Sequence, residues 1–227
     1  MSGSKTLSIA VILFPAVTFL DFQGPMELLE TAGINSGGGA LFESIPGIPR
    51  PKVRFESEYV AETREPIRGL AGPPITATKT FDEVSSQQFD IILIPGGSIQ
   101  PDNISKPLAE FVRAQVPGAQ YVLTVCSGSW VLAALGLLDG KRATSNKSLF
   151  NKIRKTNSLT VEWVAKARWV VDGNIWTSSG VTAGLDMAYE FFKTVAGLEF
   201  ATAAKNVLEL RATSSDDDEF ADVFKLT

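Results

Sequence analysis

The 227-residue sequence contains no histidine and a single cysteine, Cys126. Without a second cysteine no intrachain disulfide can form, which is typical of a reducing compartment, and we expect a cytoplasmic location. Without histidine, a zinc site with the usual ligands is excluded, and so are Ser-His-Asp and Cys-His catalytic arrangements within this chain. Any nucleophile must therefore be activated by a group other than imidazole, and we expect no metal and no cofactor.

An excess of positive charge is also lacking. The chain has 21 Lys and Arg residues against 25 Asp and Glu residues, a formal net charge of -4. Nucleic acids and anionic membranes attract clustered Lys and Arg, so neither is expected as a partner. The apolar run from Leu7 to Leu20 contains Pro15 and is too short to span a bilayer. We expect a small-molecule substrate instead.

Short apolar runs alternate with segments of helical pattern. Residues 7–13, 89–94 and 121–125 are continuously apolar or nearly so, as strands buried on both faces are. Asp172-Gly173-Asn174 separates two further apolar segments and indicates a hairpin. The pattern predicts an α/β fold: one doubly wound, mostly parallel sheet sandwiched by helices, in a single domain over residues 1–227. Residues 1–6 are expected to be disordered.

Glycine and proline set several expected boundaries. Residues 21–25 read as a turn, with a helix over 26–32 that has Pro25 near its first position. The stretch 35–51 is rich in Gly, Pro and Ser and is predicted to be a loop, in which Gly37-Gly38-Gly39 is flexible. A strand is predicted over 75–80 and a helix over 127–138.

Cys126 lies where the apolar strand 121–125 ends and a helix follows. Ligands of such sheets bind at the carboxyl ends of the strands, and a side chain in a sharp strand-to-helix turn is presented to them. Ser127 and Gly128 are small, so the turn can be tight. Unpaired N–H groups at a helix N-terminus favour a thiolate. The alternative is that Cys126 is only a small buried apolar residue; the Cys-Ser-Gly turn favours the reactive interpretation.

Two further strand ends can face the same crevice. Gly97, in Pro95-Gly96-Gly97, follows an apolar strand and can turn its N–H toward an anion, although a plain turn has the same pattern. Asp21 is flanked by Phe19, Leu20 and Phe22, and apolar surroundings raise a carboxyl pKa into the range of acid–base catalysis. The alternative for Asp21 is an N-terminal cap on the following helix.

Three separated motifs carry a family resemblance: "FDIILIPGG", "VLTVCSGSWVLAALGLLDGKRAT" and "IWTSSGVTAGLDMAYEF". Together, over about residues 7–195, they resemble the PfpI/ThiJ superfamily, which has the flavodoxin-like, class I glutamine amidotransferase-like fold. The opening "VILFPAVTFLDFQGPMELL" is similar to the isonitrile hydratase branch. The resemblance implies that Cys126 is the nucleophile, that Asp21 is the acid beside it, and that Gly97 and Ser127 bind the substrate or its oxyanion. It also implies a homodimer.

The sequence departs from many members of that superfamily at two histidine positions. Ser127 directly follows Cys126, and Ser145, Asn146 and Lys147 occupy a second region where a histidine is found in relatives. These differences argue against amidotransferase, peptidase and histidine-dependent glyoxalase activity. Residues 210–227 form a C-terminal tail that diverges from the family pattern.

The sequence is therefore interpreted as an isonitrile hydratase-like lyase that forms an N-substituted formamide through a Cys126 thioimidate, with Asp21 as general acid and base. One alternative is a natural-product tailoring enzyme, an isomerase, cyclase or hydratase using the same two residues. Another is a redox-sensing or protective protein without turnover, since an activated thiol beside an acid can be oxidised to a sulfinate.

Overall fold

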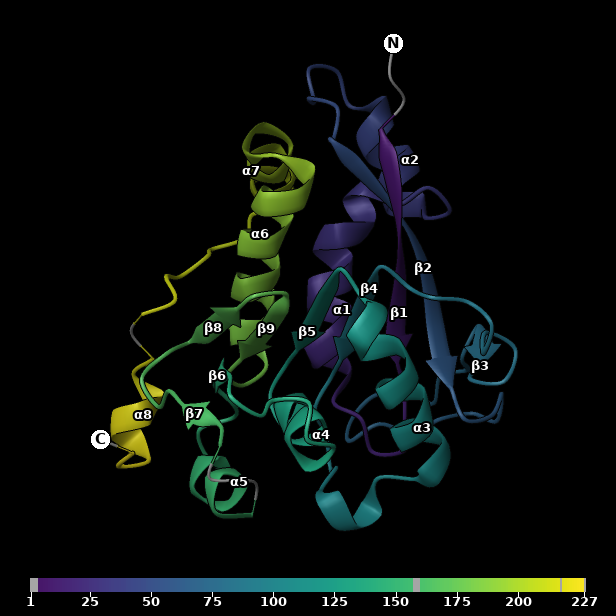
Figure 1. Ribbon diagram of the computed structural model, residues 1–227. Helices are drawn as coiled ribbons and strands as arrows, with labels where there is room; N and C mark the ends of the chain where they lie inside the picture. Colours follow the sequence, from purple (N-terminus) through teal and green to yellow (C-terminus); the bar gives the residue numbers. More distant parts are fainter. Residues whose placement is uncertain (1–3, 157–159, 217, 227) are drawn as a thin grey trace.

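A computed structural model describes residues 4–156, 160–216 and 218–226 of the chain (Figure 1). Its main sheet has seven strands in the order β3-β2-β1-β4-β5-β9-β8. Neighbouring strands are parallel except β8 and β9, which form the antiparallel hairpin. The strands are β1 (Lys5–Ile12), β2 (Val53–Ala61), β3 (Lys79–Thr80), β4 (Ile91–Ile94), β5 (Tyr121–Thr124), β8 (Trp169–Asp172) and β9 (Ile175–Ser178). The predicted doubly wound, mostly parallel sheet is confirmed.

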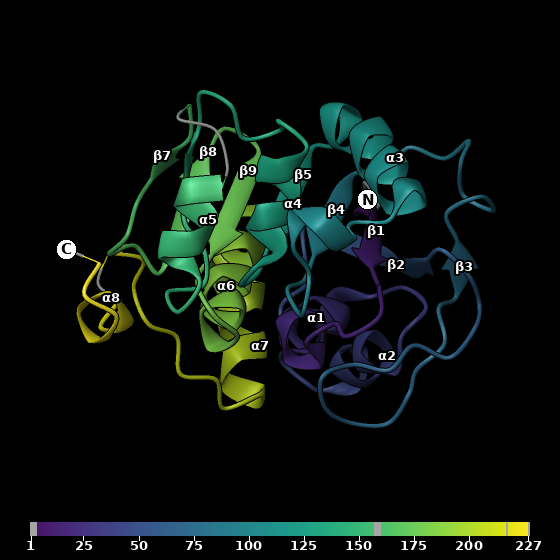
Figure 2. The ribbon, with the colours of Figure 1, turned by 90° about the horizontal axis from the view of Figure 1, so that it is seen from below.

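Helices cover both faces of this sheet. Figure 2 shows α1, α2, α6 and α7 on one side and α3, α4 and α5 on the other. The helices are α1 (Phe19–Leu29), α2 (Gly37–Ser44), α3 (Lys106–Gln115), α4 (Gly128–Ala134), α5 (Phe150–Thr156), α6 (Thr182–Ala196), α7 (Leu198–Val207) and α8 (Phe220–Val223). A small second sheet pairs β6 (Arg142–Ala143) with β7 (Glu162–Trp163). Among the described residues, no helix combines the length and apolar character needed to cross a membrane.

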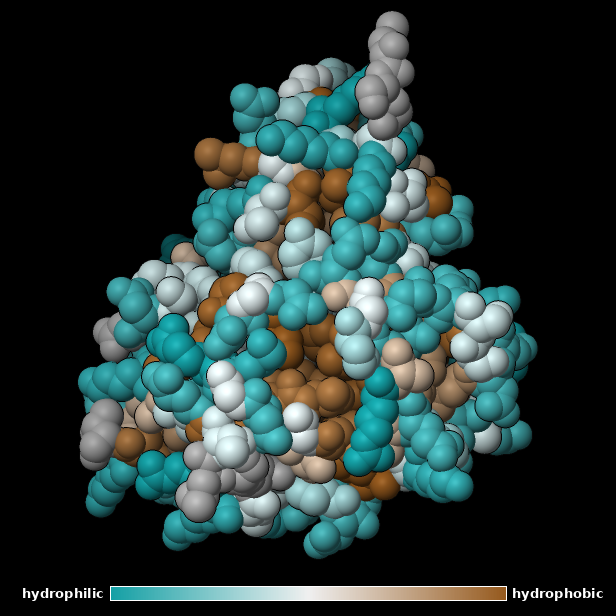
Figure 3. All heavy atoms as spheres, viewed as in Figure 1, coloured by the Kyte–Doolittle hydropathy of each residue, from teal (hydrophilic) through white to brown (hydrophobic). Residues whose placement is uncertain are grey.

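The core lies between the central strands and these helices. Ile9, Val11, Ile92, Val122 and Leu123 are each fully buried, and burying one such side chain contributes about 1.5–3 kcal/mol. Strands apolar on both faces can only stand in the middle of a covered sheet, which explains the register of β1, β4 and β5. On the face seen in Figure 3, apolar side chains also gather in a central hollow over the region of β5 and α4.

The first helix differs from the prediction. It begins at Phe19, six residues earlier than Pro25, which lies inside it. An internal proline costs about 3 kcal/mol because it removes a hydrogen bond and crowds the preceding turn. Here Phe22, Met26 and Leu29 form a fully or almost fully buried stripe, and this packing outweighs the local preference. The segment predicted as a turn is therefore helical and carries Asp21 in its first turn.

The Gly37-Gly38-Gly39 segment is also helical rather than a flexible loop. Ser36 caps α2 by accepting a hydrogen bond from the Gly39 N–H at 3.1 Å. A Cβ at Gly39 would lie 1.9 Å from the carbonyl oxygen of Gly33, and one at Gly38 2.9 Å from that of Glu30. These glycines let two stretches of backbone pack directly on each other.

Smaller corrections concern element ends. Lys5 and Thr6 belong to β1, so the expected disorder of residues 1–6 is wrong for them, while residues 1–3 lie outside the described residues. The strand predicted over 75–80 is reduced to β3, although Ile75 forms an isolated bridge with Ile67. The helix predicted over 127–138 ends at Ala134. In the C-terminal tail, α8 is a short helix.

Candidate active site

Cys126 stands in a sharp turn between β5 and α4. Its φ is 59°, in the left-handed region that a side chain with a Cβ enters only at a cost. The Cys126 N–H donates to the carbonyl of Ser179 at 2.9 Å, which anchors the turn. Gly128 must approach β4 closely, since a Cβ there would lie 2.2 Å from the Ile94 carbonyl oxygen. The turn thus has the geometry of a nucleophile elbow, as the sequence predicted.

The side chain of Asp21 reaches this turn from α1. It is fully buried, and its Oδ2 accepts a hydrogen bond from the Gly96 N–H at 2.9 Å. A Cβ on Gly96 would lie 2.8 Å from Asp21 Oδ2 and also 2.8 Å from the Cys126 Cβ. Gly96 therefore lies in the narrow space between acid and thiol. The structure brings Asp21 and Cys126 together, although they are 105 positions apart in the chain.

Burial changes the acid–base properties of Asp21. Loss of solvation raises its pKa to about 7, against smaller opposing effects of the hydrogen bonds from Gly96 and from the Cys126 thiol. The second oxygen, Oδ1, is buried and accepts no hydrogen bond of normal geometry from the described residues. The capping alternative is wrong, because α1 begins before Asp21 and the carboxyl points at Gly96. Asp21 is thus able to exchange a proton near neutral pH.

Hydrogen-bond donors approach the sulfur from other elements. Asn146 Nδ2 lies 3.2 Å from Cys126 Sγ. The orientation of this amide is fixed because its Oδ1 accepts from the N–H groups of Ser148 at 3.0 Å and Leu149 at 3.3 Å. The backbone N–H groups of Ser127 and Val181 also lower the thiol pKa. Val181 has a φ of 22° and directly precedes α6.

These donors do not make the resting sulfur a thiolate. Cys126 is 8% exposed, and burial, followed by the nearby Asp21 carboxylate, raises its pKa to about 12. The N–H groups at the start of α4 and α6 lower the thiol pKa in the direction expected from the sequence, but desolvation outweighs them and the net shift is upward. The proton stays on the sulfur until a reaction removes it.

Ser127 and Gly97 are hydrogen-bonded to each other. The Gly97 N–H donates to Ser127 Oγ at 3.1 Å, and this hydroxyl donates back to the Gly97 carbonyl at 3.1 Å. The Gly97 N–H is thus already satisfied, whereas the Ser127 backbone N–H faces the sulfur. Assignment of the two residues to oxyanion or substrate binding stays a prediction, with Ser127 the better placed.

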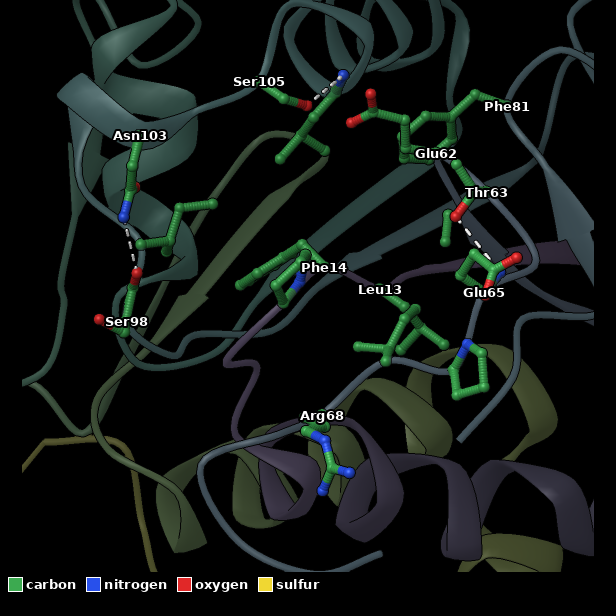
Figure 4. A pocket seen from close by; sticks show the side chains of 16 residues that line it. Leu13, Phe14, Glu62, Thr63, Glu65, Arg68, Phe81, Ser98, Asn103 and Ser105 are labelled. Atoms are coloured by element: carbon green, nitrogen blue, oxygen red, sulfur yellow. Dashed lines mark hydrogen bonds between the residues drawn. The ribbon is translucent and has the colours of Figure 1, made fainter. Parts of the chain in front are cut away.

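A cavity of about 660 Å³ opens near this edge of the sheet (Figure 4). Leu13 and Phe14, at the end of β1, contribute to its apolar lining, and Glu62, Glu65 and Arg68 add charged groups. Neither Cys126 nor Asp21 lines it, nor does Asn146. Ser98, which also lines it, is next in sequence to Gly97. The cavity therefore offers room for a ligand, but it does not include the Cys126 thiol or the Asp21 carboxyl.

Three neighbours of the sulfur escaped the sequence analysis. Asn146 was noted only as standing where relatives have histidine, and that position was the available signal. Gly96 was passed over in favour of Gly97. Val181 has no sequence signature, since its role comes from its backbone N–H.

Fold and site together define a class of α/β protein with a buried cysteine and carboxylic acid at the carboxyl edge of a parallel sheet. Comparison with known proteins agrees with this class: the DJ-1/PfpI family profile matches residues 7–194. The chain belongs to the DJ-1/PfpI family.

Individual relatives support this membership. The isonitrile hydratase of Pseudomonas putida is 31% identical over 204 residues, covering 89% of this chain and 78% of that protein. Deglycase PH1704 of Pyrococcus horikoshii is 32% identical over 139 residues, 60% of this chain and 80% of that one. A ThiJ/PfpI family protein from Pseudomonas syringae has a similar structure, with a TM-score of 0.75 at 24% identity over 98% of this chain and 86% of that one. Drosophila melanogaster DJ-1beta gives a TM-score of 0.71 at 22% identity, over 92% and 100% respectively.

Proposed function

We propose that this protein is a cysteine-dependent enzyme that hydrates an isonitrile to an N-substituted formamide. The observation that carries the proposal is the pairing of a buried thiol with a buried carboxyl whose pKa is about 7, in a chain without histidine. The 31% identity to a protein named isonitrile hydratase, over 89% of this chain, supports the same chemistry.

The first step forms a carbon–sulfur bond. The terminal carbon of the isonitrile accepts the sulfur electron pair of Cys126 while the thiol proton passes to the Asp21 carboxylate. Asp21 then delivers this proton to the same carbon, which gives a thioimidate, R–N=CH–S–Cys126. Donors at the sulfur from Asn146 and Ser127 stabilise the negative charge that develops during the attack.

The second step consumes water. Asp21 removes a proton from a water molecule as its oxygen bonds to the thioimidate carbon, and the nitrogen receives that proton. The resulting tetrahedral carbon then forms its C=O bond and releases the sulfur, which recovers a proton from the hydroxyl. The sum is addition of one water molecule to the isonitrile, and both side chains return to their starting states.

Other reactions in the family fit the site less well. Relatives of this chain include proteins named deglycases, but activation of Cys126 by a histidine, as in Cys-His sites, is impossible here. A tailoring reaction on a larger molecule would use the same two residues and is separated from hydration by the product formed.

The proposal is tested by incubating the protein with a simple alkyl isonitrile and following the formyl proton of the product by NMR. We expect the wild-type protein to form the formamide and Cys126→Ala to lose about 10⁴-fold in kcat/KM, because the covalent step is gone. A Cys126→Ala protein that still turns over the isonitrile, or a wild-type protein that does not, contradicts the proposed function.

A further inference from the structure

The C-terminal segment returns to the active-site side of the molecule. We name residues 213–226, of which residue 217 lies outside the described part, the C-terminal strap. Figure 1 shows that the chain leaves α7, passes β8 and includes α8 near its end. The backbone N–H of Arg168 donates to the Ser215 carbonyl at 2.7 Å, and the backbone N–H of Asp218 donates to the Lys166 carbonyl at 2.8 Å. The strap is thus held by backbone hydrogen bonds next to β8.

Asp218 is a buried acidic residue of the strap that pairs with a buried lysine. Its carboxylate lies 3.6 Å from Lys147 Nζ, and the two side chains are 0% and 2% exposed. The Lys147 ammonium also donates to Thr144 Oγ1 and to the Ala167 carbonyl, each at 2.7 Å. Removing one partner of a buried ion pair leaves the other charge uncompensated, so Asp218 contributes to holding the Lys147 ammonium in this position.

Lys147 directly follows Asn146, the residue whose amide contacts the Cys126 sulfur. The Phe150 N–H donates to the Lys147 carbonyl at 3.3 Å, and the ring of Phe150 packs in one apolar cluster with Ala221 and Leu226 of the strap. The ion pair and this apolar cluster both hold the strap in contact with residues 147–150. Within this segment, the N–H groups of Ser148 and Leu149 donate to Asn146 Oδ1, which links the held segment to the Asn146 amide.

We propose that the C-terminal strap, acting through the Asp218–Lys147 pair, positions Asn146 against the Cys126 thiol. Asp218 is a positioning residue, because it touches neither the sulfur nor any atom that reacts. This inference rests on the proposed role of Cys126 as nucleophile, but not on the identity of the substrate. The strap lies beyond residue 194, where the match to the DJ-1/PfpI family profile ends.

The reactivity of the single thiol gives a direct measurement. Iodoacetamide can modify only Cys126 as a thiol, and intact-mass spectrometry gives the rate constant. The measurement is made at pH 7, because burial lowers the pKa of Lys147 to about 8 and the ion pair requires its ammonium form. Losing the Asn146 donor disfavours the thiolate, so we expect Asn146→Ala to react about tenfold more slowly. We expect Asp218→Asn to react about threefold more slowly, since the amide is loosened but still present.

A double-mutant cycle separates positioning from general weakening of the structure. If Asp218 acts through Asn146, adding Asp218→Asn to Asn146→Ala produces no further decrease. Asp218→Glu, which keeps the charge, restores most of the rate. The matched control is Asp222→Asn on the same strap: this exposed carboxylate pairs with Lys166 at 3.3 Å, and its loss leaves the alkylation rate unchanged.

Two results overturn the inference. One is a folded Asp218→Asn protein that reacts at the wild-type rate; the other is an equal decrease in both backgrounds. If Asp218→Asn does not fold, Leu226→Ala, which weakens the contact with Phe150, must show the same non-additivity with Asn146→Ala. Because alkylation needs no isonitrile, a chain that fails to hydrate isonitriles can still confirm the strap. A wild-type thiol that iodoacetamide cannot modify contradicts both proposals.

Discussion

The neighbours of the Cys126 sulfur form two groups with opposite effects on the thiol pKa. We call Asp21 the acid side, and Asn146 with the Val181 N–H the donor side. On one side lies the buried carboxyl of Asp21, whose charge raises the thiol pKa. On the other side, the amide of Asn146 and the N–H of Val181 lower it. Burial adds to the effect of Asp21, so the sulfur is protonated at rest. The difference suggests two separate roles. Asp21 transfers the protons of the proposed reaction, and the donors stabilise negative charge on the sulfur.

The two sides also differ in how the fold builds them. Asp21 is held within α1 by a buried apolar stripe, and Gly96 follows the central strand β4. Asn146 stands in the connection between β6 and α5, and its neighbours are held by the strap. Regular elements with buried apolar faces thus hold the acid, whereas the donor lies on irregular backbone whose neighbours contact the strap.

The largest expected effect is on the acid side. Asp21→Asn keeps the size of the side chain and can still accept the Gly96 N–H, but it cannot take up the thiol proton. We expect kcat/KM for isonitrile hydration to fall about 10³-fold, the usual magnitude for a general acid–base residue. The assay is formyl-proton NMR, with the exposed Asp82→Asn as control. An Asp21→Asn enzyme within tenfold of wild type would assign the proton transfers elsewhere.

A smaller loss is expected when the spacing between Asp21 and the Cys126 turn is disturbed. Gly96→Ala would place a Cβ 2.7 Å from the Ser127 nitrogen and 2.8 Å from both Asp21 Oδ2 and the Cys126 Cβ, so these groups must move apart. A misplacement of reacting groups by about 1 Å can lower the rate about 10²-fold, because the groups lose their alignment. Gly37→Ala is the matched control, because its Cβ would meet nothing within 4 Å. Unchanged kcat/KM in folded Gly96→Ala would show that this spacing is unimportant.

The smallest effect is a pH dependence. The proposed first step needs an ionised Asp21 and a protonated Cys126, whose pKa values are about 7 and about 12. We therefore expect kcat/KM to fall about tenfold per pH unit below pH 7 and to be flat between about pH 7.5 and 9. Formamide formation at fixed low substrate concentration measures the profile. A profile whose acid limb lies near pH 4 would mean that burial does not raise the Asp21 pKa.

Sequence patterns predicted the parts of the site that regular structure holds. Short, mostly apolar runs identified β4 and β5, and with them the turn at Cys126 and the nearby glycines. Asp21 was placed correctly beside the thiol by resemblance, although its element was not, because the preference for proline at a helix start concealed α1. Tertiary packing overrode that preference.

The donor side could not be predicted in the same way. Asn146 reaches the sulfur from the connection between β6 and α5. The Asp218–Lys147 pair that we propose to support it spans 71 positions, and a contact at that separation leaves no periodic pattern in one sequence. Val181 contributes an N–H that every residue except proline has. The glycines of α2 were taken for a loop because their use, close packing against Gly33, becomes visible only in three dimensions.

The left-handed φ of 59° at Cys126 has a consequence for what the position selects. A glycine would adopt this conformation without the steric penalty of about 1–2 kcal/mol that a Cβ brings. Stability by itself thus gives no reason for a sulfur-bearing residue at this bend. What a thiol offers there, and a glycine cannot, is reactivity.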